Sequence, residues 1–115
     1  MPYLLVQTNA HEGLVKKEIF LKDATSAVAE MTGKPAEKVM IGLQTDIAMS
    51  FGGSEETCAF VHLKSLGLPP ADAPRYVAAL CDLLEQSLHI HPNRVFVQLS
   101  DHPRNLWGSD SVTFG

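Results

Sequence analysis

The alternation of apolar and polar residues along the chain predicts four β-strands. Each of these segments is rich in β-branched or aromatic residues and changes character at every second position, which is the period of a strand. The predicted strands are Tyr3 to Thr8, Val39 to Gln44, Cys58 to Lys64 and Val95 to Ser100. Between the second and the third, the pair Gly52-Gly53 favours a turn.

Two helices are predicted between the strands, because apolar residues there recur at intervals of three and four. The first is expected from about Glu12 to Thr32, where Gly33 ends it, and the second from about Ala73 to Leu88, with Asp72 as its cap. The apolar stripes that should face the sheet are Leu14, Val15, Ile19, Ala24, Ala27, Val28 and Met31 on the first helix, and Val77, Leu80, Leu84 and Leu88 on the second.

The resulting order is a strand–helix–strand unit that occurs twice. A proline, Pro35 or Pro92, precedes the last strand of each copy, so the two halves echo each other weakly. A strand–helix–strand crossover makes its two strands parallel. The chain is therefore expected to form a single α+β domain over residues 1–115, with a four-stranded mixed sheet and two helices on one face.

Alternation also sorts the strand residues onto two faces of different character. One face is wholly aliphatic and must lie under the helices, whereas the other mixes apolar and polar residues. This mixed face holds Tyr3, Leu5, Gln7, Met40, Gly42, Gln44, Cys58, Phe60, His62, Lys64, Phe96, Gln98 and Ser100. Such a mixture is typical of a subunit interface or a binding site. We therefore predict that self-association buries the mixed face.

Composition and charge narrow the classes of function. Of the 115 residues, 45% are apolar and 19% are charged, which is typical of a globular domain. The formal net charge of −4 argues against binding to nucleic acid or to an anionic membrane, because both need a basic surface.

The short apolar stretch after Met1 is unlike a signal peptide, so a cytoplasmic protein is expected. Cys58 and Cys81 form no C-x-x-C motif and are expected to be buried, reduced thiols.

Pro2 is the first candidate for catalysis. Methionine aminopeptidase removes Met1 before a small residue such as proline, which would leave a secondary amine at the start of the first strand. An α-amino group has an ordinary pKa of about 8. Burial against Tyr3, Phe96 or Phe114, with a lysine nearby, would lower that pKa, and a neutral amine is a good general base. Many proteins also begin with Met-Pro and make no catalytic use of the proline.

Lys34 is the second candidate and has two interpretations. Its charge complements the dipole at the end of the first helix, or it anchors a substrate carboxylate. The glycine spacing before it is not that of a phosphate-binding loop.

The histidines do not form a metal-binding motif, and no cluster of carboxylates accompanies them. Neither a metal nor another cofactor is expected. His89, His91 and His102 are interpreted as surface residues of loops, while Trp107 is interpreted as a core or interface residue.

Short motifs occur along the whole chain in a specific order and spacing. They are Met1-Pro2 opening a strand that ends Gln7-Thr8-Asn9, then Thr32-Gly33-Lys34-Pro35, Met49-Ser50-Phe51-Gly52-Gly53-Ser54, Lys64-Ser65-Leu66-Gly67, Asn93-Arg94-Val95-Phe96-Val97 and the ending Thr113-Phe114-Gly115. Together they resemble the macrophage migration inhibitory factor and D-dopachrome tautomerase family, within the tautomerase superfamily.

The resemblance implies a homotrimer whose sheets wrap into a barrel, with active sites at the subunit boundaries. It implies a keto–enol tautomerase of the phenylpyruvate or dopachrome type, which needs no cofactor and acts on a small aromatic α-keto acid. Pro2, exposed by the removal of Met1, would be its catalytic base.

The resemblance also implies a substrate-binding set around this amine. Lys34 would hold the substrate carboxylate, helped by the backbone near Ser65 and Leu66. Phe114 and Tyr3 would line an aromatic pocket.

The chain departs from the family pattern at several positions. Phe96 stands where the family usually has a tyrosine, and Gln98 where it has an asparagine, and both positions normally face the site of the adjacent subunit. Phe96 keeps an apolar wall but removes a phenol donor. Val61 replaces the second cysteine of a C-x-x-C, so thiol-oxidoreductase activity is not expected. Ser109 occupies the family's tryptophan position, and Trp107 comes slightly earlier.

Two other functions stay open at this point. The chain could instead be a secreted, cytokine-like binding protein that leaves the cell without a signal peptide, binds a receptor and has weak or vestigial tautomerase activity. A different reaction at the same amine, such as decarboxylation or dehalogenation, has no additional acid or arginine motif in its favour.

Overall fold

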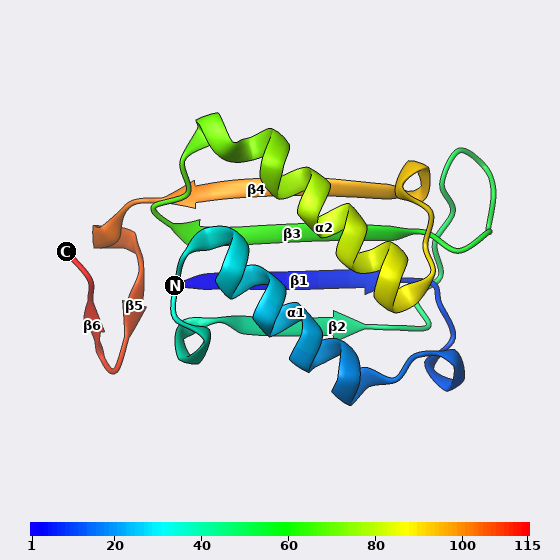
Figure 1. The fold of residues 1–115 in the computed structure, drawn as a ribbon, viewed down its shortest axis with the longest axis horizontal. Coiled ribbons are helices and arrows are strands. Elements are labelled where there is room, and N and C mark those ends of the chain that lie inside the picture. Colours follow the sequence, from blue (N-terminus) through cyan, green and yellow to red (C-terminus); the bar gives the residue numbers. More distant parts are fainter.

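A computed structural model describes residues 1–115 and contains a four-stranded sheet in the order β2-β1-β3-β4 (Figure 1). The strands are β1 (Pro2–Thr8), β2 (Met40–Gln44), β3 (Ala59–Leu66) and β4 (Val95–His102). β1 is parallel to β2 and β3 is parallel to β4, while the central strands β1 and β3 are antiparallel to each other. The α+β fold with a mixed sheet is therefore confirmed.

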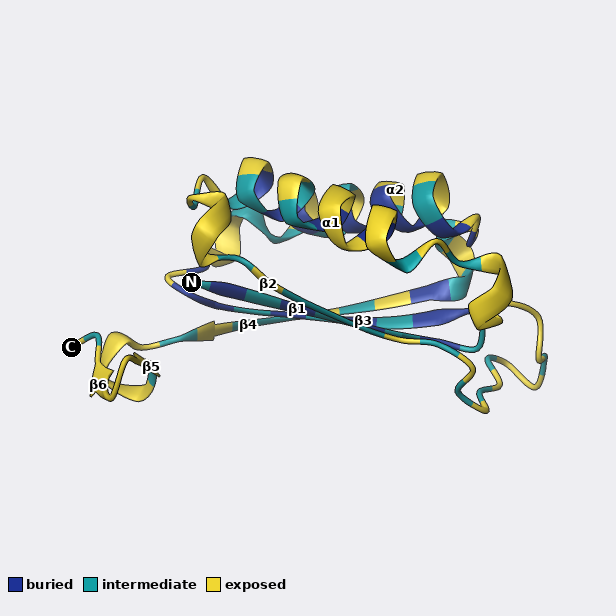
Figure 2. Ribbon diagram, turned by 90° about the horizontal axis from the view of Figure 1, so that it is seen from below, coloured by how far each residue is buried: buried dark blue, intermediate teal, exposed yellow.

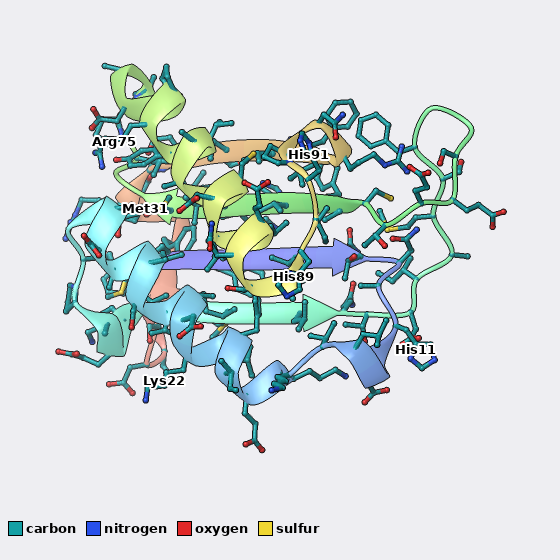
Figure 3. The ribbon with its side chains drawn as sticks, turned by 45° about the vertical axis from the view of Figure 1, so that its right-hand side comes forward. His11, Lys22, Met31, Arg75, His89 and His91 are labelled. Atoms are coloured by element: carbon teal, nitrogen blue, oxygen red, sulfur yellow. The ribbon has the colours of Figure 1, made fainter.

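Two helices, α1 (Lys17–Thr32) and α2 (Ala73–Leu88), cover one face of this sheet (Figure 2). α1 ends at Gly33, whose φ of 69° lies in the left-handed region that glycine adopts without strain. Arg75, in the first turn of α2, donates a hydrogen bond to the carbonyl of Met31 at 2.9 Å (Figure 3). This bond ties the start of α2 to the end of α1. No helix combines the length and the apolar character that are needed to cross a membrane.

The hydrophobic core lies between the helices and the aliphatic face of the sheet. Its central residues come from β1 and β3, which have a strand on either side, and Leu4, Val6, Val61 and Leu63 are fully buried. On the edge strands, aliphatic residues such as Ile41 are only partly buried against the same core. Each fully buried leucine or valine contributes about 1.5–3 kcal/mol.

The first helix begins later than the sequence pattern indicates. Residues Glu12–Leu14 form a separate 3₁₀ turn, and the α-helix starts at Lys17. The backbone N–H of Glu12 donates to Asp46 at 2.9 Å, which holds this turn against the loop after β2. The stripe that faces the sheet is consequently Phe20, Ala24, Val28 and Met31. Leu14 and Ile19 were expected in that stripe but are 86% and 54% exposed.

Several local expectations are corrected by tertiary packing. Asp72 precedes α2 as predicted, but its side chain makes no capping hydrogen bond and instead pairs with Arg75 at 3.4 Å. Cys58 lies just before β3 and is buried, in a pocket that Phe51 and Phe96 also line, and Cys81 is only half-buried. His102 belongs to β4 and is half-buried, because β4 continues beyond the predicted end at Ser100.

The last residues form a small hairpin that the strand pattern did not predict. After a 3₁₀ turn at Arg104–Leu106, β5 (Gly108–Ser109) pairs with β6 (Val112–Thr113). Both residues of the connecting turn have positive φ, 50° at Asp110 and 68° at Ser111, as two-residue hairpin turns require. Figure 1 shows this hairpin beyond the end of the main sheet, on the side where the chain begins.

The mixed face of the sheet carries no helix (Figure 2). Met40 on β2 is 66% exposed there, and Phe96 on β4 is 60% exposed. At one end the face is bordered by the loop between β2 and β3, in which Phe51 bridges to Ser54 around Gly52-Gly53. The predicted turn at these glycines is confirmed, since both have positive φ.

Candidate functional site

The amino terminus opens at one end of the sheet, in the middle of its width. Pro2 is the first residue of the central strand β1 and is fully buried, and it pairs with the buried Ser65 at the end of β3. A proline has no N–H for a strand ladder, so the first position of a strand accommodates it well. The strand order thus places the chain's amino group where β3 ends.

A cleft of about 450 Å³ lies beside this amino group. Its walls come from three segments that are far apart in the sequence, namely the start of β1, the entry into β2 and the carboxy-terminal hairpin. The lining residues are Met1, Pro2, Tyr3, Glu37, Lys38, Val39, Met40, Trp107, Gly108, Ser109, Asp110, Val112 and Phe114. The cleft therefore combines aromatic and aliphatic walls with charged groups at its edge.

Lys34 lies next to the same end of the sheet. It follows Gly33, whose left-handed backbone turns the chain away from α1. The Nζ atom of Lys34 donates to the carbonyl of Leu66 at 2.9 Å, and the hydroxyl of Ser65 donates to the same carbonyl at 3.1 Å. These contacts hold the lysine head group over the end of β3.

The electrostatic environment disfavours a charged amino terminus. Burial, and then the positive charges of Lys34 and Lys38, lower the pKa of the α-amino group of Met1 below its ordinary value. An amine at this end of β1 is consequently easier to keep neutral than one in water. Such a group is able to accept a proton from a bound molecule.

The structure brings together part of the predicted site and separates the rest. Pro2, Tyr3 and Phe114 line one cleft, and Lys34 holds the end of β3 next to it. Phe96 is paired with Phe60, which is paired with Gln7 on β1. Gln7 and Pro2 lie near opposite ends of β1, and at about 3.3 Å per residue Phe96 is therefore about 16 Å from Pro2 along the strand direction.

Phe96 and Gln98 thus lie outside the cleft of their own chain. The ring of Phe96 packs on Phe51, with ring centroids 4.6 Å apart, and Gln98 is paired with His62 in the middle of the mixed face.

Sequence reasoning missed two features of this region. Trp107 lines the cleft, because the hairpin folds back toward β1, and no local pattern indicates this. His62 and Ser100 form a hydrogen bond of 2.7 Å across β3 and β4. Alternation did place both residues on the mixed face, where they are diagonal neighbours, because His62 is paired with Gln98 and Ser100 with Lys64.

No group of three or more histidine, cysteine, aspartate or glutamate side chains is positioned to hold a metal ion. Figure 3 shows His11, His89 and His91 at separate places on the molecule.

A model of the macrophage migration inhibitory factor (MIF) family matches residues 1–115. This chain belongs to the MIF family. It is 37% identical over 115 residues to macrophage migration inhibitory factor of Rattus norvegicus, with 99% of each chain covered. It is 35% identical over 116 residues to the macrophage migration inhibitory factor homolog of Brugia malayi, with 100% of each chain covered.

Solved structures of MIF-family proteins have the same fold. The macrophage migration inhibitory factor of Trichinella spiralis superposes with a TM-score of 0.92 at 29% identity, over 97% of this chain and 99% of that one. The homologue from Prochlorococcus marinus superposes with a TM-score of 0.88 at 31% identity, over 98% of this chain and 99% of that one. Membership of the MIF family also places the chain in the tautomerase superfamily of isomerases.

Proposed function

We propose that this MIF-family chain is a keto–enol tautomerase of the phenylpyruvate or dopachrome type, and that its general base is the amine of Pro2 after removal of Met1. The observation that carries this proposal is the amino terminus itself. It opens into a cleft with aromatic walls, and burial together with Lys34 and Lys38 lowers the pKa of the amine there. In the processed chain the same end of β1 would carry the secondary amine of proline.

The proposed reaction moves one proton between two atoms of an α-keto acid. The neutral amine of Pro2 takes a proton from the carbon next to the carbonyl, and the electron pair of that C–H bond forms the carbon–carbon double bond of the enol. The carbonyl oxygen then receives the proton from the ammonium that has formed. A positioned base of this kind contributes about 10²–10⁴-fold to the rate.

The surrounding residues have proposed roles in binding. An ammonium group has three donors, so Lys34 can hold a substrate carboxylate while it keeps its hydrogen bond to Leu66. Ser65 steadies the same carbonyl. Tyr3 and Phe114 form the walls that hold an aryl group and exclude water from the amine.

We further propose that three copies assemble through the mixed face. Phe96 and Gln98 are far from the cleft of their own chain, which agrees with a role in the site of a neighbouring subunit. The same assembly would cover the exposed side chain of Phe96. We expect a cytoplasmic protein that needs no cofactor.

The decisive experiment compares the wild type with Pro2→Gly in an ultraviolet assay of phenylpyruvate enolisation. We expect kcat/KM to fall by up to about 10²–10⁴-fold, the contribution of a general base, since the variant replaces the secondary amine of proline with a primary amine. Intact mass spectrometry must first show that Met1 is absent from both proteins. Equal rates for the two proteins would refute the role of Pro2.

A matched control leaves every side chain of the site in place. A chain extended at its amino terminus keeps Pro2 but converts its nitrogen into a non-basic amide. We expect this protein to lose activity as well, while circular dichroism shows an unchanged fold.

A second candidate function is a secreted, cytokine-like ligand with weak or vestigial activity. The absence of a phenol at Phe96 favours it, because the family's usual tyrosine is missing from the proposed neighbouring wall. Binding to a receptor that survives Pro2→Gly, with no turnover of any keto acid by the wild type, would support this function over catalysis.

A further inference from the structure

We infer that Gly42 positions Tyr3 in the wall of the amino-terminal cleft. Gly42 lies within β2, where a glycine weakens a strand and often marks a close approach by another group. Its backbone does not require glycine, because the glycines with positive φ are Gly33, Gly52, Gly53 and Gly67. The space left by the missing side chain at residue 42 is instead occupied by a neighbour.

That neighbour is the ring of Tyr3. A Cβ atom at Gly42 would lie 2.7 Å from the Oη atom and 3.5 Å from the Cε1 atom of Tyr3. Tyr3 is paired with Met40, two residues before Gly42, so its ring leans along the sheet and covers the glycine. The phenol oxygen occupies the place that any other side chain at residue 42 would take.

This contact determines the shape of the cleft. Tyr3 lines the cleft together with Pro2 and Phe114. A side chain at residue 42 forces the ring away from the sheet, and the open space beside it is the cleft. Gly42 thereby keeps the ring of Tyr3 out of the cleft into which the amine of residue 2 would open once Met1 is removed. This role rests on the proposed tautomerase function and adds a positioning residue to it.

A double-mutant cycle tests the role of Gly42. We expect Gly42→Ala to raise the KM for phenylpyruvate about tenfold, because a displaced ring competes with the substrate, and to leave kcat nearly unchanged. In a Tyr3→Ala background, Gly42→Ala should have little further effect. A Cβ at residue 42 also lies 3.2 Å from Leu5, and because this contact is present in both backgrounds, the cycle isolates Tyr3. An equal rise in KM in both backgrounds would overturn the inference.

The role of Gly42 can also be tested without turnover, first by the binding of an unreactive acid. 3-Phenylpropionate has an aryl group and a carboxylate but no keto group, and its binding can be followed by the fluorescence of Trp107, the single tryptophan, which lines the cleft. We expect the same tenfold weakening of its Kd in Gly42→Ala. If the wild type does not enolise phenylpyruvate but Gly42→Ala still weakens the binding of this acid, the proposed reaction fails and the positioning role stands. An unchanged Kd in Gly42→Ala would overturn the positioning role.

The position of the ring can be observed directly in the wild type. Nuclear Overhauser effects should connect the ring protons of Tyr3 with the Cα protons of Gly42. The chain has two tyrosines and the other, Tyr76, is buried in the core, so the assignment is simple. Absence of these effects would contradict the inference whatever the variants do.

Discussion

At the scale of single residues, His62 is a titratable group outside the cleft whose surroundings shift its pKa. It lies on β3 at the centre of the mixed face and shares a 2.7 Å hydrogen bond with Ser100. Burial, and then the charges of Lys64 and His102, lower its pKa from the ordinary value of 6.5. No aspartate or glutamate belongs to this face, so nothing there compensates a protonated imidazole.

The lowered pKa predicts a loss of stability in acid. Because the unfolded chain binds a proton at His62 at a higher pH than the folded chain does, the free energy of unfolding should decrease as the pH falls below about 6.5. Urea unfolding at a series of pH values measures this slope. We expect His62→Gln to flatten the dependence of the unfolding free energy on pH between pH 7 and the pKa of His62 in the folded chain. An unchanged slope in that variant would show that other groups cause the loss of stability.

At the scale of elements, one guanidinium group bonds several carbonyls of the loop between β2 and β3. Arg94, just before β4, donates to the carbonyls of Phe51 at 2.9 Å, Ser54 at 3.1 Å and Glu56 at 2.8 Å. It also lies over the ring of Phe51, 5.1 Å from the centroid. The loop that borders the mixed face is therefore tied to β4 by a planar fork of donors.

Arg94→Lys should release this loop even though the charge is kept. A lysine presents one ammonium group and cannot bond several carbonyls in the plane of a guanidinium. We expect faster amide exchange over residues 45–57 and a loss of about 1–3 kcal/mol in the free energy of unfolding. Arg104→Lys is the control, since the Arg104 guanidinium bonds the carbonyl of Phe114, outside this loop. The side-chain amide of Asn9 also donates to this loop, at 3.0 Å to the carbonyl of Glu55 and 3.2 Å to that of Glu56. Unchanged exchange in Arg94→Lys would mean that such other contacts suffice to hold the loop.

At the scale of the whole molecule, the sheet has one covered face and one open face (Figure 2). The helices bury the aliphatic side, and the opposite side exposes 60% of Phe96 and 66% of Met40. An apolar surface of this kind between polar neighbours is typical of protein interfaces. The proposed trimer would supply the missing layer.

Phe96→Glu should therefore break the assembly. A buried, unpaired carboxylate costs several kcal/mol at an interface, so sedimentation should give the mass of a single chain instead of three. Ile19→Glu is the matched control, because Ile19 is also apolar and 54% exposed but lies on α1, on the covered side of the sheet. The same change in mass for both variants, or none for Phe96→Glu, would contradict assembly through the mixed face.

The sequence by itself determined the order of the elements and the two faces of the sheet. Period-two alternation and the three-to-four spacing of apolar residues are local properties, and they predicted the four strands of the main sheet and the span of α2. The same alternation separated an aliphatic face from a mixed face. Other local signals singled out Pro2, which follows Met1, and Lys34, which follows the glycine at the end of the first helix.

Only the tertiary structure decided which distant segments meet. The strand order β2-β1-β3-β4 puts the start of β1 beside the end of β3, and the hairpin brings Trp107 and Phe114 to the same cleft. A hydrogen bond to Asp46 holds the turn before α1, and the ring of Tyr3 occupies the space left by the missing side chain of Gly42. Such contacts join residues that are far apart in the chain, so no local period in the sequence records them.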